Sequence, residues 1–242
     1  MKLKRLQPLL VLTFAVALVS FGSSLRAEVV DDQLFTLVKI DQLEVRFQDG
    51  DDVAAWDGQA RIGTDRHKLA VKSEGEYVVD PNHMENAEVQ FLYLRLISDF
   101  FDAQIGVRHD FEPDPSRTFA VVGINGLAPQ WFEVDASLFL SDEGDVSARF
   151  EVEYDILITQ RLVLQPDAEI NVAFSDDEPT GVGSGVSNVE LGLRLRYEFA
   201  REFAPYLGIN WERKLGNTSD FARAEGEDDN VFSVVAGLRI FF

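Results

Sequence analysis

The chain has 242 residues, of which 42 are acidic and 22 are basic, and it carries a net charge of −20 at pH 7. This acidity argues against binding to nucleic acid, and also against binding to an anionic membrane surface by overall charge. The chain contains no cysteine, so we expect neither a disulfide framework nor a lipid-anchored N-terminal cysteine.

The N-terminal segment has the pattern of a secretory signal peptide, which we assign to residues 1–27. A basic start, Met1–Arg5, precedes an apolar run from Leu9 to Val19 and small residues up to Ala27. The apolar run is too short for a comfortable transmembrane helix. We expect cleavage after Ala27, with Ser24 as the alternative position. The segment holds four basic and no acidic residues, so its removal changes the charge of −20 to −24.

From Leu34 onward the hydrophobic pattern has a period of two residues, which is typical of strands. About twelve strands are predicted, each near the length of a tilted strand that crosses a bilayer. In chain order they cover residues 34–47, 53–64, 67–79, 86–97, 101–109, 118–126, 131–140, 146–156, 162–174, 189–199, 203–215 and 231–242.

Charged side chains repeatedly occupy the middle of these strands, on the face opposite the apolar one. Between Val146 and Ile156, for example, apolar residues alternate with Arg149, Glu151 and Glu153. Water or other charges must therefore cover one face, while the other face is apolar over its whole length. A soluble β-sandwich, which buries apolar faces against each other, also fits this alternation.

The connections between strands favour the membrane alternative. If both termini lie on one side, the connections on that side are short, and those on the opposite side are mostly long and acidic. The short ones are 64–66, 98–99, 127–130, 159–161 and 200–202, and the others are 80–85, 112–117, 176–185 and 216–229. Short periplasmic turns that alternate with longer external loops are typical of outer-membrane barrels.

We therefore predict an all-β fold, a transmembrane antiparallel β-barrel of the outer-membrane type over residues 28–242. Outer-membrane lipid would surround it in a Gram-negative cell. The strand 231–242 would close the barrel against the strand near Leu34, so that no edge is exposed. Its terminal Phe242 is expected to act as the recognition signal for the barrel-assembly machinery.

The inward face carries more acidic than basic residues. These are Glu74, Glu76, Arg108, Glu133, Asp135, Arg149, Glu151, Glu153, Asp167, Glu169, Glu190, Arg194, Arg196 and Glu212. One interpretation is an interior filled by mutually satisfied ion pairs, since unpaired buried charges are costly. The other is a lumen that passes or holds cations, as in a general channel with an acidic, cation-preferring interior.

Candidate metal ligands are His83, Met84 and His109. If the strand from residue 86 pairs with residues 101–109, His109 lies opposite about Glu88, and all three candidates approach the external rim. Imidazole and thioether together suit copper, the thioether favouring Cu(I). The alternative is three unrelated surface residues. His67 falls at the other rim, as a solvated turn residue. No histidine has a serine arranged beside it for nucleophilic catalysis, so an enzyme is not expected.

Several long runs resemble the copper resistance protein B family (CopB/PcoB) of bacterial outer-membrane proteins. They are Trp56–Gly63, Lys72–Glu76, Gly106–Phe111, Pro115–Thr118, Gly126–Asp135, Gly144–Arg149, Tyr154–Leu162, Gly183–Tyr197, Phe203–Tyr206 and Asn210–Lys214. The resemblance implies an outer-membrane barrel that binds copper ions and aids copper sequestration or export, together with periplasmic copper-resistance proteins. His109 lies within one of these runs.

The sequence departs from this family in one respect. Family members often carry a Met- and His-rich leader before the barrel, thought to bind copper, whereas only Glu-Val-Val-Asp-Asp-Gln separates Ala27 from Leu34. Met84 is the only methionine after the predicted signal peptide. We therefore expect any copper site to use few ligands.

Overall fold

A computed structural model of the protein describes residues 33–80 and 82–242. The predicted signal peptide, residues 1–27, lies outside the described residues. No helix among the described residues is long and apolar enough to cross a membrane.

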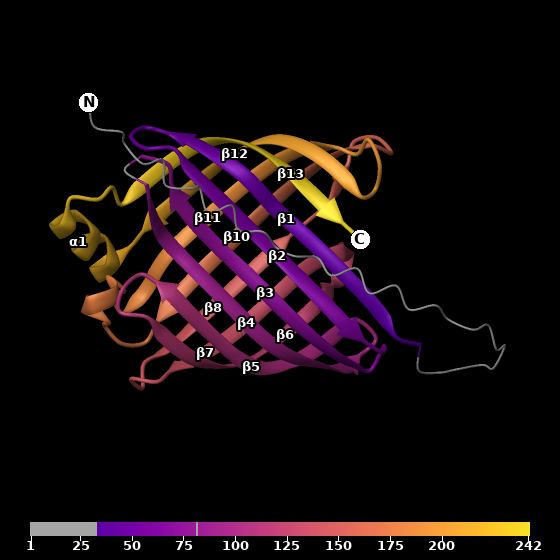
Figure 1. Ribbon diagram of the computed structural model, residues 1–242, viewed down its shortest axis with the longest axis horizontal. Coiled ribbons are helices and arrows are strands. Elements are labelled where there is room, and N and C mark those ends of the chain that lie inside the picture. Colours follow the sequence, from indigo (N-terminus) through magenta and orange to yellow (C-terminus); the bar gives the residue numbers. More distant parts are fainter. Residues whose placement is uncertain (1–32, 81) are drawn as a thin grey trace, which may run out of the picture. The chain divides into compact units, whose positions relative to one another are not determined.

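The described residues form one antiparallel sheet that closes on itself into a barrel (Figure 1). The sheet has thirteen strands, of which β9 has only two residues, so twelve long strands make the wall. Their bounds are β1 Phe35–Gln48, β2 Val53–Gly63, β3 His67–Val78, β4 His83–Ser98, β5 Phe101–Glu112, β6 Arg117–Ala128, β7 Phe132–Ser141, β8 Val146–Glu153, β9 Ile156–Leu157, β10 Leu162–Ala173, β11 Gly185–Tyr197, β12 Phe203–Lys214 and β13 Asn230–Phe241. The predicted barrel of about twelve strands is confirmed.

The last strand closes the barrel, in the role predicted for residues 231–242. β13 pairs antiparallel with β1, and Ile240 lies opposite Ile40. Beyond β13, the backbone of Phe242 exchanges two hydrogen bonds of 2.8 Å with Val38. Because the backbone N–H and C=O groups of β1 and β13 pair with each other, neither of these strands leaves an edge exposed to lipid.

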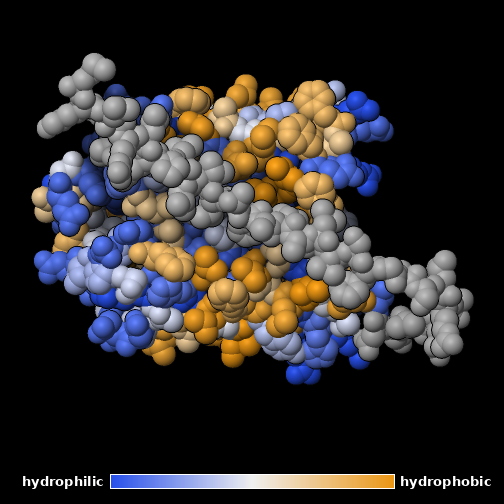
Figure 2. Space-filling model, in the orientation of Figure 1, coloured by the Kyte–Doolittle hydropathy of each residue, from blue (hydrophilic) through white to orange (hydrophobic). Residues whose placement is uncertain are grey.

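The two faces of the wall differ as the alternation predicts. In β13, Phe232 and Val234 are 55% and 51% exposed, whereas Ser233 and Val235 between and beside them are buried. The apolar face therefore points outward. On the face drawn in Figure 2, hydrophobic side chains gather in the middle of the barrel and hydrophilic side chains lie toward both ends. Such a belt is what a wall facing hydrocarbon requires.

The two ends of the barrel carry different connections. Residues 64–66, 99–100, 198–202 and other tight turns lie at one end, here called the short-turn end, at the right of Figure 1. The opposite, long-loop end carries residues 174–184 and 215–229. The predicted difference in length between the connections at the two ends depends on these two long loops. The loop predicted at 80–85 does not contribute, because β4 begins at His83 and leaves only residues 79–82 as a connection.

A helix within the last loop was not predicted. α1 (Gly216–Glu225) ends at Gly226, which adopts a left-handed φ of 87°. The helix buries Thr218, Ser219 and Ala222, and the Thr218 hydroxyl accepts a 2.9 Å hydrogen bond from the backbone N–H of Gly183. Such a mostly polar buried face has no hydrophobic periodicity for the sequence to reveal.

Candidate functional site

The barrel encloses a cavity of about 590 Å³ whose lining is dominated by charged side chains. At one extreme the lining includes Leu37, Phe100, Leu127 and Phe241, which lie at the short-turn end. At the other extreme it reaches a layer of side chains containing Arg46, Glu76, Glu190, Glu74, Glu88 and Arg149, partway toward the long-loop end. The cavity therefore opens toward the short-turn end.

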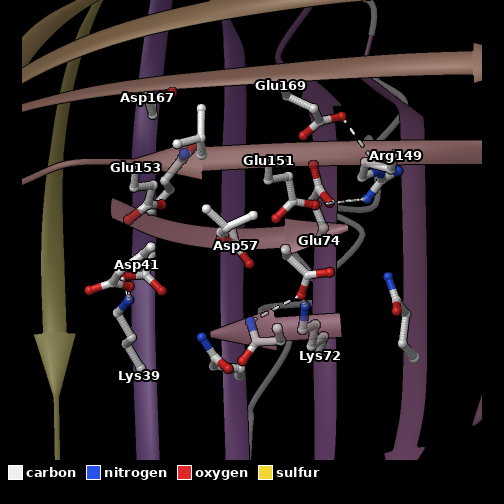
Figure 3. A pocket seen from close by; sticks show the side chains of 18 of the residues that line it. Lys39, Asp41, Asp57, Lys72, Glu74, Arg149, Glu151, Glu153, Asp167 and Glu169 are labelled. Atoms are coloured by element: carbon white, nitrogen blue, oxygen red, sulfur yellow. Dashed lines mark hydrogen bonds and ion pairs between the residues drawn. The ribbon is translucent and has the colours of Figure 1, made fainter. Parts of the chain in front are cut away.

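Arg149 crosses the lumen at the deep end of this cavity. It projects from β8, and its guanidinium lies 2.9 Å from carboxylate oxygens of both Glu74 on β3 and Glu88 on β4. Four long strands separate β8 from β3 in the sheet, so this ion pair joins nearly opposite walls (Figure 3). The guanidinium of Arg108 also lies 2.8 Å from the carboxylate of Glu88. The interior is thus filled by paired charges on this side.

A second network fills the remaining part of the same layer. Arg46 lies 2.7 Å from Glu76 and 3.0 Å from Glu190. The guanidinium of Arg194 lies 2.9 Å from the carboxylate of Glu44. The Tyr206 hydroxyl donates a 2.8 Å hydrogen bond to the same carboxylate. Glu44 and Arg194 are each 3% exposed, so the Glu44–Arg194 pair is shielded from water. We call the Arg46 and Arg149 networks together the ion-pair layer.

Nearer the short-turn end, fewer ion pairs cross the lumen than in the ion-pair layer. Lys72 on β3 lies 2.5 Å from Asp135 on β7, which also accepts hydrogen bonds from Gln104 and Ser137. Lys39 lies 2.8 Å from Asp41 and 3.5 Å from Glu133. β1 and β7, which carry Lys39 and Glu133, have five long strands between them in either direction.

On the strands that line the cavity, three carboxylates lack a close cationic partner among the described residues. Asp57 makes no ion pair within 4.0 Å, and neither does Glu153, which accepts a 2.8 Å hydrogen bond from Gln165. Glu151 reaches Arg149 only at 4.0 Å. All three project into the same cavity from β2 and β8 (Figure 3). We call them the free carboxylates. They give this part of the lumen more carboxyl groups than cationic side chains.

The residues predicted as metal ligands are placed differently. His83 and Met84 begin β4 instead of lying in the preceding loop, and they pair with Val78 and Tyr77. Consecutive residues of a strand point to opposite faces. Met84 therefore shares the outward face of Tyr77, whereas His83 lies on the side of the buried Val78. The structure does not point these two side chains at one site.

His109 lies opposite Val89 and not Glu88. The predicted pairing of the two strands is confirmed with a difference of one residue, and His109 shares the outward face of Ile105 and Val107. There its Nδ1 lies 2.9 Å from the Thr118 hydroxyl, and its ring meets Phe111 edge to face. Met84 is five residues from Val89 along β4, about 16 Å away. His83, Met84 and His109 are therefore not brought together.

The described residues contain no group of three or more His, Asp or Glu side chains already arranged to hold a metal ion. The predicted set of inward charges omitted Asp41, Glu44, Arg46 and Asp57. On β1, a bulge between Ile40 and Glu44 shifts the alternation, so that Asp41 and Glu44 both face the lumen although they are three positions apart. Asp57 lay on the predicted polar face of its strand, and that alternation was the signal that could have identified it.

Comparisons with known proteins agree with one another. The family model described as copper resistance protein B precursor (CopB) matches residues 34–242. The chain is 42% identical to copper resistance protein B of Escherichia coli over 92% of its own length and 75% of the relative. It is 41% identical to a copper resistance protein B homolog of Pseudomonas syringae pv. tomato, over 89% of the chain and 72% of that protein.

Among solved structures, the barrel is similar to the NanC porin. The TM-score is 0.53 at 12% sequence identity, with 84% of this chain and 98% of the porin covered. At this identity the likeness concerns the fold alone.

Proposed function

The chain belongs to the copper resistance protein B family, and its β-barrel lies in the outer membrane; on that premise we propose that it binds copper ions in its lumen and aids their sequestration or export. Copper is the cargo in this proposal, and no catalytic step is involved. Periplasmic copper-resistance proteins would deliver or receive the metal at the short-turn end, which is the periplasmic end in barrels of this kind.

The free carboxylates carry this proposal. Asp57, Glu151 and Glu153 face a cavity that opens toward the short-turn end, so a cation from the periplasm reaches them past the Lys39 and Lys72 ion pairs but without crossing the ion-pair layer. Oxygen ligands suit Cu(II) better than Cu(I), which prefers sulfur. We therefore propose Cu(II) as the form held in the lumen.

The ion-pair layer favours holding copper over free diffusion. A cation moving from the free carboxylates toward the long-loop end meets Arg149 or Arg46, which are both positively charged and both bound to carboxylates. Passage would require these side chains to move. A general cation-preferring channel remains the alternative function, and it is supported by the surplus of carboxylates in the lumen.

His83, Met84 and His109 are the second candidate site. Titration of the purified mature protein with Cu(II) separates the two sites. We expect stoichiometric binding to survive replacement of these three residues by alanine, and to weaken at least tenfold in the Asp57→Asn, Glu151→Gln, Glu153→Gln variant, because amides keep the shape but remove the charge. The reverse pattern would place copper at the rim and overturn the lumen site. If neither variant differs from wild type, both sites are wrong.

A further inference from the structure

The outer surface of the barrel at the short-turn end carries a basic and aromatic patch that the copper proposal does not use. It consists of Arg66, His67, Tyr93 and Arg95, which belong to the β3–β4 region, and we call it the rim patch. All four residues are exposed. Their position near the end of the apolar belt corresponds to the level at which lipid headgroups meet a barrel.

Strand pairing places these groups together. His67 lies directly opposite Arg95, and the next residues on the same face, Leu69 and Tyr93, also oppose each other. Side chains paired in this way have Cβ atoms about 5 Å apart. The carbonyl of Arg66 accepts a 3.0 Å hydrogen bond from the backbone N–H of Leu96, so the turn that carries Arg66 lies against β4 beside Arg95.

The imidazole ring of His67 contacts Tyr93 through a hydrogen bond and by stacking. Nδ1 of His67 lies 2.5 Å from the Tyr93 hydroxyl, and the two rings are stacked with their centroids 6.0 Å apart. This hydrogen bond engages Nδ1 and leaves Nε2 as the second polar atom of the ring. The patch therefore combines two flexible guanidinium groups with an oriented imidazole.

The positive charge of the rim patch is not neutralised by the protein. Among the described residues, no carboxylate lies within 4.0 Å of the guanidinium of Arg66 or Arg95. Five arginines on the outside of the described barrel lack such a partner. Of these, Arg66, Arg95, Arg161 and Arg201 lie at the short-turn end and only Arg213 lies near the long-loop end. The arginines at this end are therefore available to an anion from outside the protein.

An apolar surface continues from the patch toward the middle of the barrel. Leu69 and Phe91 are 60% and 61% exposed on the same outward face. A ligand that satisfies both parts has an anionic head at the level of the arginines and a hydrocarbon tail along these side chains. Guanidinium groups bind phosphate through paired, charge-assisted hydrogen bonds. Basic residues near a membrane surface attract anionic lipids.

We propose that the rim patch binds the phosphate of an anionic phospholipid in the periplasmic leaflet. The two guanidinium groups and Nε2 of His67 contact the headgroup, and one acyl chain lies over Leu69 and Phe91. An acidic protein partner would match the charge of the arginines but would leave the adjoining apolar surface in lipid. The lipid is therefore the occupant that accounts for both parts of the surface.

The test compares two arginines at opposite ends of the barrel. The mature protein is reconstituted in phosphatidylcholine nanodiscs that contain a minority of phosphatidylglycerol, and lipids retained after transfer to detergent are counted by native mass spectrometry. We expect wild type to retain phosphatidylglycerol over phosphatidylcholine. Arg95→Gln should reduce that retention roughly fivefold, and Arg66→Gln with Arg95→Gln further. Arg213→Gln, the matched control at the long-loop end, should retain phosphatidylglycerol as wild type does.

Four results would overturn the proposal. Equal retention of the two lipids by wild type would show that the headgroup charge is not recognised. If Arg213→Gln lost as much phosphatidylglycerol as Arg95→Gln, the retention would depend on the overall charge of the protein and not on the rim patch. Displacement of the lipid by inorganic phosphate at the same concentration would show a free anion site. Binding of polyglutamate in place of phosphatidylglycerol would indicate an acidic protein partner.

Discussion

At the scale of single residues, the interior depends on a few arginines that each serve several carboxylates. Arg149 contacts Glu74 and Glu88 at 2.9 Å and Glu169 at 3.4 Å, and its side chain is 9% exposed. Glu88 is still more buried, at 2% exposed. A buried carboxylate that loses a cation keeps its desolvation cost without the compensating attraction.

Replacement of Arg149 should therefore destabilise the barrel strongly. We expect Arg149→Met to lower the free energy of unfolding by about 2–4 kcal/mol, a loss limited because Glu88 keeps Arg108. Urea unfolding of the protein in lipid vesicles measures the change. Arg213→Met serves as the control, because Arg213 is exposed and no carboxylate of the described barrel lies within 4.0 Å of it. Equal unfolding midpoints for the two variants would contradict the structural role assigned to Arg149.

At the scale of elements, the closing strand shows how strictly the wall separates its two faces. Leu238 lies on the apolar face of β13, opposite Pro205 of β12, whereas the adjacent Arg239 lies 3.2 Å from Asp41 in the lumen. One strand therefore carries an apolar side chain toward lipid and a charged one toward the interior. The same substitution has different consequences at the two positions.

A charge on the outward face of β13 should impair membrane insertion. Leu238→Asp places a carboxylate toward lipid, at a cost that decreases from the bilayer centre to its surface. We expect a lower folded fraction on insertion into lipid vesicles, measured by heat-modifiable migration in gels, whereas Leu238→Val should insert normally. Removal of Phe242 should also reduce insertion, since its backbone holds Val38. Insertion of Leu238→Asp at the wild-type level would contradict the outward orientation.

The elements also show where a pattern-based prediction fails. His109 was expected opposite Glu88, but bulges beside Ala87 and Leu96 set the register of β4 against β5. A bulge adds one residue to one strand, and the hydrophobic alternation does not reveal which strand carries it. The partner expected for His109 was therefore wrong by one residue.

At the scale of the whole molecule, the lumen of the barrel contains a cavity that opens toward the short-turn end. The cavity runs inward from the short-turn end to the ion-pair layer, where ion pairs join distant strands. A porin-like fold alone therefore does not specify an open pore. The width of the passage depends on which side chains meet inside the barrel.

Conductance measurements test this arrangement. We expect the wild-type protein in planar bilayers to show little steady current. Replacement of both Arg46 and Arg149 by alanine should increase conductance and favour cations, because it removes two positive charges and the side chains that cross the lumen. The Arg213→Ala variant controls for the reconstitution. A steady cation-selective current through the wild-type protein would instead support the general channel.

The sequence alone determined the strand pattern, the outward apolar face and the closing strand. Each of these depends on side-chain alternation or connection length, which are local properties of the chain. It also indicated the family, through long runs of residues. It could not determine that Arg149 meets Glu74, that Asp57 has no close cationic partner among the described residues, or that His83, Met84 and His109 lie apart. Those relations depend on register, bulges and closure of the sheet, which bring together residues far apart in the chain, and only the tertiary structure specifies them.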